Sequence, residues 1–187
     1  MRVISGSARG RRLKELQGMD TRPTTDKVKE SIFNIIQFDL EGRKVLDLFG
    51  GTGQLGIEAL SRGSVHCTFV ETRRDAVTLL KDNLKTVDFM DKARVVQGDA
   101  LAFLSSCREQ FDVILLDPPY HTDLMDKAID SILAFDILAE HGIMVCETAA
   151  DRELAPLPED LFEPGRSYRY GQIKLSIFRR KGKERKV

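Results

Sequence analysis

The tetrapeptide Asp117-Pro118-Pro119-Tyr120 directly follows an apolar run over residues 113–116. Two consecutive prolines fix φ and remove backbone donors, so the segment predicts a stiff loop. In such a loop the Asp117 carboxylate and the Pro118 carbonyl can accept both hydrogens of an exocyclic amine on a base. That arrangement orients the nitrogen lone pair towards an electrophile, while Tyr120 stacks on the extruded base. The residue types therefore favour group transfer to a base amine, and a rigid turn after a core strand is the alternative interpretation.

A glycine-rich turn between residues 47 and 56 is the second candidate site. Gly51, Gly53 and Gly56 satisfy the G-x-G-x-x-G pattern, and Glu71 lies 20 residues beyond Gly51. Glycine allows a sharp turn and lets a ligand approach the main chain. The Glu71 carboxylate can accept hydrogen bonds from ribose hydroxyls. The pattern alone fits both a nicotinamide enzyme and a methyltransferase, and a tight turn without a ligand is the structural alternative.

Four acidic residues end four successive predicted strands. Ligands of open α/β sheets bind beyond the carboxyl ends of the strands, which is where these side chains fall. Asp99 is placed to accept from an adenine amino group, although acids also close strands simply because loops are solvated. The four residues are Asp47, Glu71, Asp99 and Asp117.

Strand and helix patterns alternate along most of the chain, which predicts a parallel sheet covered on both faces. Residues 168–170 and 173–178, with Gly171 between them, predict an antiparallel hairpin at one edge. We therefore expect one doubly wound α/β domain over residues 1–187. The predicted strands are 44–49, 67–71, 93–97, 111–116 and 143–147, and the predicted helices are 25–38, 54–62, 73–86, 100–107 and one marked by Leu124, Ala128 and Ile132.

The composition is that of a soluble globular protein, with 42% hydrophobic and 31% charged residues. No apolar run is long enough to span a membrane, and the N-terminus lacks the apolar centre of a secretory signal. Cys67, Cys107 and Cys146 are isolated in apolar segments, which predicts free, buried thiols in a cytoplasmic protein. The histidines are also isolated, so we expect no metal site.

The net charge of zero conceals two basic ends. Residues 1–14 carry five basic and no acidic residues, and residues 179–187 carry six basic and one acidic residue. The remainder carries 18 basic and 28 acidic residues. A basic N-terminal extension (1–24) and a basic tail (179–187) suit contact with a polyanion, although a solvated, frayed tail explains the second equally well.

These motifs together resemble the class I amino-methyltransferases. Within them, the chain is similar over nearly its whole length to the RsmD-type methyltransferases, which act on guanine N2 of 16S ribosomal RNA. The aspartate–proline–proline–aromatic motif is shared by many base-amine methyltransferases, whereas the threonine–arginine–proline–threonine stretch is more particular. The resemblance is carried by residues 6–13, 21–26, 45–49 with the glycines that follow, 58–63 and 117–120. One departure is Gly50, which stands where alanine is usual.

The resemblance implies a Rossmann-like fold with seven strands, S-adenosylmethionine as cofactor, and methylation of guanine N2 in small-subunit ribosomal RNA. The implied catalytic residues are Asp117, Pro118, Pro119 and Tyr120. The candidate RNA-binding residues are Arg9, Arg11 and Arg12 of the basic N-terminal extension, together with Arg22. The resemblance places Arg22 in the cleft lining, where it could meet a phosphate or the cofactor carboxylate. The alternative interpretation is that Pro23 and Thr25 simply start the predicted helix. The implied cofactor-binding residues are Thr24, Asp47, Phe49, Gly50, Gly51, Gly53, Glu71, Asp99 and Ala100.

No segment is left for a separate recognition domain, so we expect a monomer that reads an assembled ribonucleoprotein surface and has no membrane partner. The first alternative is an adenine-N6 methyltransferase with the same tetrapeptide. A non-catalytic RNA-binding module with this fold is the second, and a nicotinamide dehydrogenase is weaker because it has no use for the tetrapeptide. A protein-glutamine methyltransferase usually has asparagine where Asp117 stands.

Overall fold

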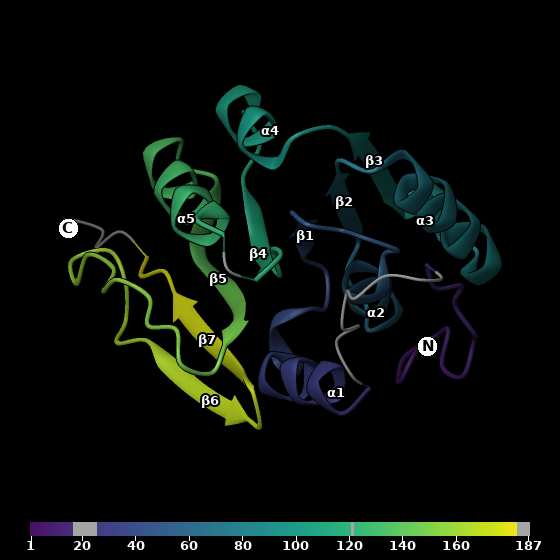
Figure 1. Cartoon of the computed structure of the whole chain (residues 1–187), viewed down its shortest axis with the longest axis horizontal. Coiled ribbons are helices and arrows are strands. Elements are labelled where there is room, and N and C mark those ends of the chain that lie inside the picture. Colours follow the sequence, from purple (N-terminus) through teal and green to yellow (C-terminus); the bar gives the residue numbers. More distant parts are fainter. Residues whose placement is uncertain (17–25, 121, 183–187) are drawn as a thin grey trace.

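The computed structural model describes residues 1–16, 26–120 and 122–182. Within these ranges a seven-stranded sheet has the order β3-β2-β1-β4-β5-β7-β6 (Figure 1). Neighbouring strands from β3 to β5 are parallel, and β7 is antiparallel to both β5 and β6. The predicted sheet and its edge hairpin are therefore confirmed. The strands are β1 (Lys44–Asp47), β2 (His66–Glu71), β3 (Ala93–Gln97), β4 (Phe111–Leu116), β5 (Leu138–Ala149), β6 (Arg166–Tyr170) and β7 (Ile173–Arg179).

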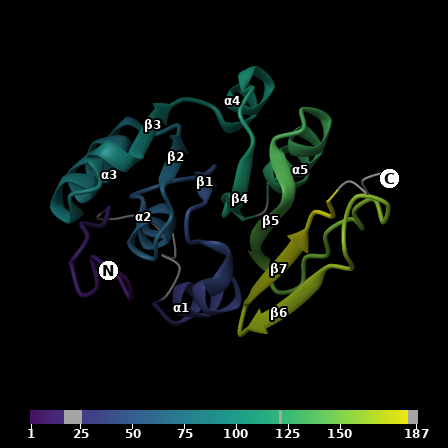
Figure 2. The ribbon, with the colours of Figure 1, turned by 180° about the vertical axis from the view of Figure 1, so that it is seen from behind.

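Helices cover both faces of the sheet, as views from the two sides show (Figures 1 and 2). Side chains alternate along each strand, so neighbouring residues serve opposite hydrophobic clusters: Val45 and Leu115 pack on one face, and Leu46 and Leu116 on the other. The helices α1 (Asp26–Ile35), α2 (Gln54–Ser61) and α3 (Arg74–Val87) cover the first face, and α4 (Ala100–Ser106) and α5 (Leu124–Ala134) the second. Two short 3-10 helices are η1 (Gln37–Asp39) and η2 (Met90–Lys92).

Two predicted elements differ most from the structure, whereas the strand predicted over 44–49 ends two residues early, at Asp47, and several other ends shift by one residue. The helix predicted over 25–38 ends at Ile35. Ile36 leaves the helical conformation, with a φ of −104° and a ψ of 17°, and the chain then forms η1, in which Asp39 N–H donates to the Ile36 carbonyl in the i−3 pattern of a 3-10 turn. The strand predicted over 143–147 begins five residues earlier, at Leu138. A register shift against β4 and a positive φ of 59° at His141 interrupt its first part, which therefore lacks the apolar run of the rest.

The basic N-terminal segment packs against α2. Its backbone is held by Glu58, which is fully buried and accepts from the N–H groups of Ile4 and Ser5 at 2.8 and 3.0 Å. Ser61 accepts from Ala8 N–H at 2.9 Å through its hydroxyl oxygen. Buried acceptors that pair with backbone donors fix this segment on the domain, so residues 1–14 form part of the folded body.

The first basic residues of the predicted tail are also tied to the domain. Arg179 forms a two-pronged ion pair with Asp39, at 3.0 and 2.9 Å. Arg180 donates to Asp136 at 2.6 Å, and Lys181 donates to the carbonyl of Glu159. These contacts give the three cations a role in joining β7 to the body, whereas residues 183–187 lie outside the described ranges.

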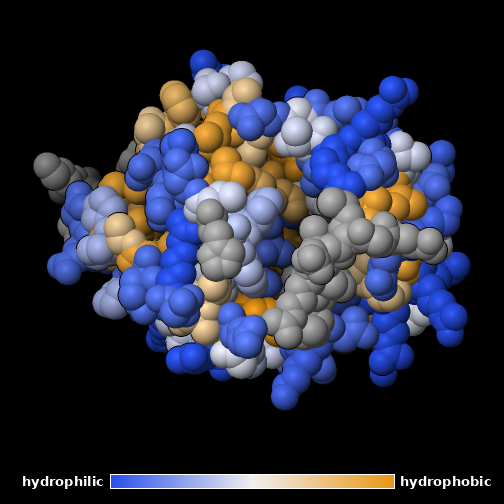
Figure 3. All heavy atoms as spheres, in the orientation of Figure 1, coloured by the Kyte–Doolittle hydropathy of each residue, from blue (hydrophilic) through white to orange (hydrophobic). Residues whose placement is uncertain are grey.

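The surface in the orientation of Figure 3 is mostly hydrophilic, with hydrophobic residues gathered near its middle. None of the described helices is long and apolar enough to cross a membrane. The three cysteines are buried and unpaired, as predicted. Among the described residues no group of three or more His, Cys, Asp or Glu is placed to hold a metal ion.

Candidate cofactor and base-binding site

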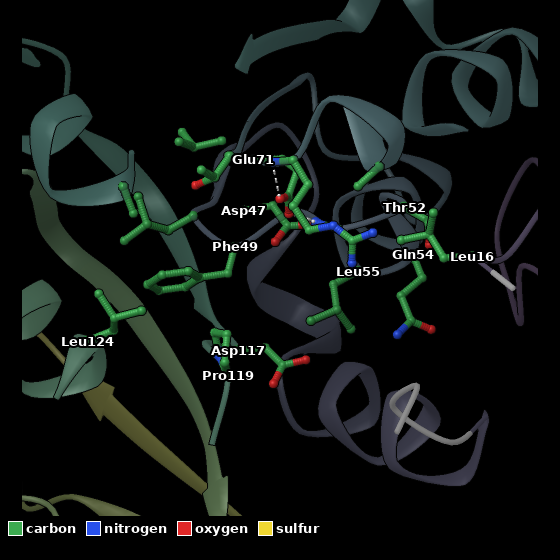
Figure 4. Close-up of a pocket in the computed structure, with 18 of the residues that line it drawn as sticks. Leu16, Asp47, Phe49, Thr52, Gln54, Leu55, Glu71, Asp117, Pro119 and Leu124 are labelled. Atoms are coloured by element: carbon green, nitrogen blue, oxygen red, sulfur yellow. Dashed lines mark hydrogen bonds between the residues drawn. The ribbon is translucent and has the colours of Figure 1, made fainter. Parts of the chain in front are cut away.

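A cavity of about 530 Å³ opens beyond the carboxyl ends of β1, β2 and β4. Strand order reverses between β1 and β4, and this is the position at which doubly wound sheets bind ligands. Figure 4 shows Asp47 and Glu71 together on one side of the cavity and Asp117 across it. The predicted site residues that line it are Asp47, Phe49, Gly50, Gly51, Glu71, Asp99, Ala100, Asp117 and Pro119.

Glu71 anchors the glycine turn. Its Oε2 accepts from Gly51 N–H and its Oε1 from Arg73 N–H, each at 2.8 Å. The carboxylate thus has a set orientation at the end of β2, on the wall of the cavity. A carboxyl oxygen has more than one lone pair, so each can still accept from a hydroxyl group of a ligand.

Gly53 and Gly56 are required by close packing of the turn. Gly53 has a φ of +89°, and a Cβ there would lie 2.2 Å from a methyl carbon of Leu80. A Cβ on Gly56 would lie 2.2 Å from the ring of Phe69, which is fully buried. Gly53 does not line the cavity and serves instead to start α2.

Replacing Gly56 with alanine is expected to lower the free energy of unfolding by about 1–3 kcal/mol, since the added methyl overlaps the Phe69 ring. Gly50→Ala is the matched control: its Cβ would meet Phe69 Cβ at an ordinary 3.4 Å, with no positive φ. This second change should be neutral or stabilise by up to about 1 kcal/mol. Urea unfolding of both variants measures the difference, and equal effects would contradict the packing role of Gly56.

Asp47 is a buried acid of the site. The pKa of its carboxyl is raised to about 7: burial is the largest cause, the hydrogen bond from Gly56 N–H partly opposes it, and the charge of Glu71 adds to it. That bond joins Gly56 N to Asp47 Oδ2 at 2.9 Å. The carboxylate is placed to meet a positive charge on a ligand, which would offset its desolvation.

The raised pKa of Asp47 predicts a pH dependence of stability. The folded form holds this proton up to about pH 7, whereas the unfolded chain releases it near 3.8. The ligand-free protein should therefore lose stability as pH rises from about 4 to beyond 7, by a few kcal/mol at most. Asp47→Asn should remove this loss, and Asp91→Asn, at an exposed position, should not. Urea unfolding of the three proteins from pH 5 to 8.5 tests this; identical curves would contradict it.

The loop after β4 brings Asp117 and Pro119 to the cavity, while Pro118 and Tyr120 line a smaller neighbouring cavity of about 250 Å³. Asp117 and Tyr120 are half-buried, and Pro118 is buried. The Tyr120 hydroxyl donates to Oε1 of Glu147 at 3.0 Å. Thr122 Oγ1 donates to the Pro119 carbonyl at 2.9 Å, which tightens the loop.

The remaining predicted site residues lie in the cavity, on the surface, or outside the described ranges. Asp99 lines the cavity but also caps α4, because its Oδ1 accepts from Ala102 N–H at 2.8 Å. Arg9, Arg11 and Arg12 are exposed on the N-terminal segment. Thr24 and Arg22 lie outside the described residues.

Several lining residues were missed by sequence reasoning. The Oε1 atom of Gln54 is buried and has no hydrogen-bond partner among the described residues, so it is an acceptor suited to a donor on a ligand. Leu55 and Ala76 add apolar walls from α2 and α3, and Thr72 and Arg73 follow Glu71. The only available signal for the last two was their position directly after β2. A carboxylate on the sheet edge, an unpartnered amide oxygen, apolar walls and an open glycine turn fit an adenosine-bearing, positively charged cofactor.

Comparisons with known proteins agree with this geometry. The family described as "Conserved hypothetical protein 95" matches residues 1–179. A Bacillus subtilis protein named "Putative rRNA methyltransferase YlbH" is 43% identical, covering 97% of this chain and 100% of the relative. The Haemophilus influenzae "Ribosomal RNA small subunit methyltransferase D" is 38% identical over 82% of this chain and 81% of its own.

A solved structure described as "Putative methyltransferase yhhF from Escherichia coli" superposes with a TM-score of 0.87 at 31% identity, covering 98% of this chain and 99% of that one. The family match, the identities and the shared fold lead to one conclusion: the chain belongs to the RsmD-type family of Rossmann-like class I methyltransferases.

Proposed function

We propose that this protein methylates the exocyclic N2 amine of a guanine in small-subunit (16S) ribosomal RNA, with S-adenosylmethionine as cofactor. The observation that carries the proposal is that Asp117, the acceptor for a base amine, shares one cavity with Glu71 and the glycine turn. The relatives named for small-subunit ribosomal RNA support the substrate class. A non-catalytic module would not need this combination of groups.

The residues of the cavity have different roles, which depend on where each one lies. Glu71 holds the glycine turn and accepts from the ribose, and Asp47 faces the positive end of the cofactor. S-adenosylmethionine supplies an electrophilic methyl group. Asp117 and the Pro118 carbonyl orient the amine, and Asp117 or water takes the proton that the methylated nitrogen releases.

The RNA surface includes Arg9, Arg11 and Arg12. Their side chains are exposed, and Glu58 and Ser61 hold this segment through its backbone N–H groups. The guanidinium groups can therefore meet phosphates without loosening the segment. An assembled ribonucleoprotein particle as substrate, a cytoplasmic location and a monomeric state complete the proposal.

Replacing Arg9, Arg11 and Arg12 together with alanine should weaken RNA binding while cofactor binding persists. Losing up to three phosphate contacts should reduce the slope of log K against log salt by about 2–3. Arg94, Arg108 and Lys127, which are exposed elsewhere on the protein, provide a control with the same change of charge. Calorimetric titrations with RNA and with cofactor measure both effects. Equal loss of both affinities would contradict a specific RNA role.

Transfer of labelled methyl to three substrates tests the proposed function. These are undermethylated small ribosomal subunits, the naked RNA from them and duplex DNA, each followed by nucleoside analysis. We expect N2-methylguanosine, with subunits the best substrate. Label in N6-methyladenosine would contradict the guanine target and support the adenine-N6 alternative. No label on any substrate, with cofactor still bound, would favour the non-catalytic module.

A further inference from the structure

Glu147, near the carboxyl end of β5, is a buried acid to which the proposed function assigns no role. Its exposed fraction is 4%, and its Oε1 accepts the hydrogen bond from Tyr120 at 3.0 Å. The four residues before it, Ile143–Cys146, are apolar and form the core of the strand. Burying a carboxylate is costly, so its presence here points to a specific task.

The sheet register places Glu147 beside Asp117, the first residue of the loop after β4. Leu116 on β4 pairs with Cys146 on β5, so the next residues on the two strands are Asp117 and Glu147. Side chains alternate, and Val145 packs in the cluster under α1 and α2, which puts Glu147 on that same face. The backbone of Glu147 therefore lies beside Asp117, and its carboxylate accepts a hydrogen bond from Tyr120, three residues further along the loop.

A second polar residue near the end of β5 holds Thr122 and α5. Arg152, just beyond β5, donates to the carbonyl of Thr122 and to Asp126 Oδ2, each at 2.8 Å. The small cavity beside the loop is lined by Tyr120, Glu147 and Arg152 together. Arg152 holds the backbone at Thr122, and Glu147 holds the side chain of Tyr120.

We propose that Glu147 is a positioning residue for methyl transfer, whose carboxylate holds the Tyr120 ring where the target base stacks beside Asp117. This inference rests on the proposed function. A ring already fixed before the base arrives loses less freedom when the base is clamped, and the amine meets Asp117 in the reactive orientation more often. Glu147 acts through Tyr120 and donates nothing to the reaction itself.

Four variants test the coupling: Tyr120→Phe, Glu147→Ala, the double variant and Glu147→Gln. The first two each break the same hydrogen bond, so each should lower kcat about tenfold with cofactor Kd unchanged. The double variant should be no slower than the worse single one, because one interaction is lost only once. Glu147→Gln keeps an acceptor oxygen and should recover most of the rate. Glu140→Gln, on the exposed part of the same strand, is the matched control and should keep the wild-type rate.

A measurement independent of activity separates this inference from the proposed function. The chain has three tyrosines, Tyr120, Tyr168 and Tyr170, so Cζ-labelled tyrosine gives three carbon signals in NMR, and Tyr120→Phe assigns one. Glu147→Ala should move the Tyr120 signal and leave the other two in place. An unmoved signal, additive kinetic losses or a wild-type rate in Glu147→Ala would each overturn the inference. An inactive wild-type protein would contradict the proposed function, and the NMR shift would still decide whether Glu147 holds the ring.

Discussion

Asp117→Ala is expected to reduce kcat for methyl transfer by about 10²- to 10⁴-fold, the range seen when an orienting and proton-accepting group is lost. The carboxylate stands across the cavity from Glu71 and the glycine turn (Figure 4), so cofactor affinity should change by less than about threefold. Steady-state assays with labelled cofactor measure kcat, and calorimetry measures cofactor Kd. A variant that turns over at the wild-type rate would remove Asp117 from the reaction.

The conservative change Asp117→Asn separates the two roles of this carboxylate. An amide keeps one acceptor oxygen for an amine hydrogen but accepts no proton. We expect a loss of rate between those of the wild type and Asp117→Ala. Undiminished turnover in Asp117→Asn would show that water alone takes the proton, and thermal unfolding of both variants controls for loss of the fold.

The sheet was predictable because each strand carries its own signal. Val113–Leu116 and Ile143–Cys146 are buried on both faces, so they show as continuous apolar runs between polar loops. No comparable sequence pattern predicts that residues 1–14 pack on the domain. This packing depends on Glu58 and Asn83, polar residues on α2 and α3 that are fully buried and accept hydrogen bonds from backbone N–H groups of the N-terminal segment. Long-range polar contacts of this kind join parts of the chain that no local pattern connects.

In the site, too, the residues at strand ends were predictable and the long-range polar contacts were not. Asp47, Glu71 and Asp117 were predictable, since strand ends in a parallel sheet converge on one edge. The pairing of Tyr120 with Glu147 was not, because it depends on how far the loop folds back over β5. The pKa of Asp47 also required the structure, since its cause is complete burial beneath α2.

Glu71 is the second residue whose loss should have a large effect. Two backbone N–H groups, of Gly51 and Arg73, point at its carboxylate from the turn and from the start of α3. Removing the carboxylate therefore withdraws the ribose acceptor and also leaves two donors to be satisfied elsewhere. Hydrogen bonds to a charged group contribute about 1.5–3 kcal/mol each.

Glu71→Ala should consequently weaken cofactor binding by about 10²-fold, with a smaller loss for Glu71→Gln, which keeps an acceptor for one of the two N–H groups. The two N–H groups left unpaired should also lower the unfolding midpoint, so affinity is measured by calorimetry well below that temperature. Asp99→Ala is the informative comparison. Asp99 lines the same cavity but gives one oxygen to the cap of α4, so its loss should affect the helix as much as the cofactor. If Glu71→Ala bound cofactor as tightly as the wild type, the carboxylate would be a clamp for the turn alone, and the ribose would have to be held from elsewhere in the cavity.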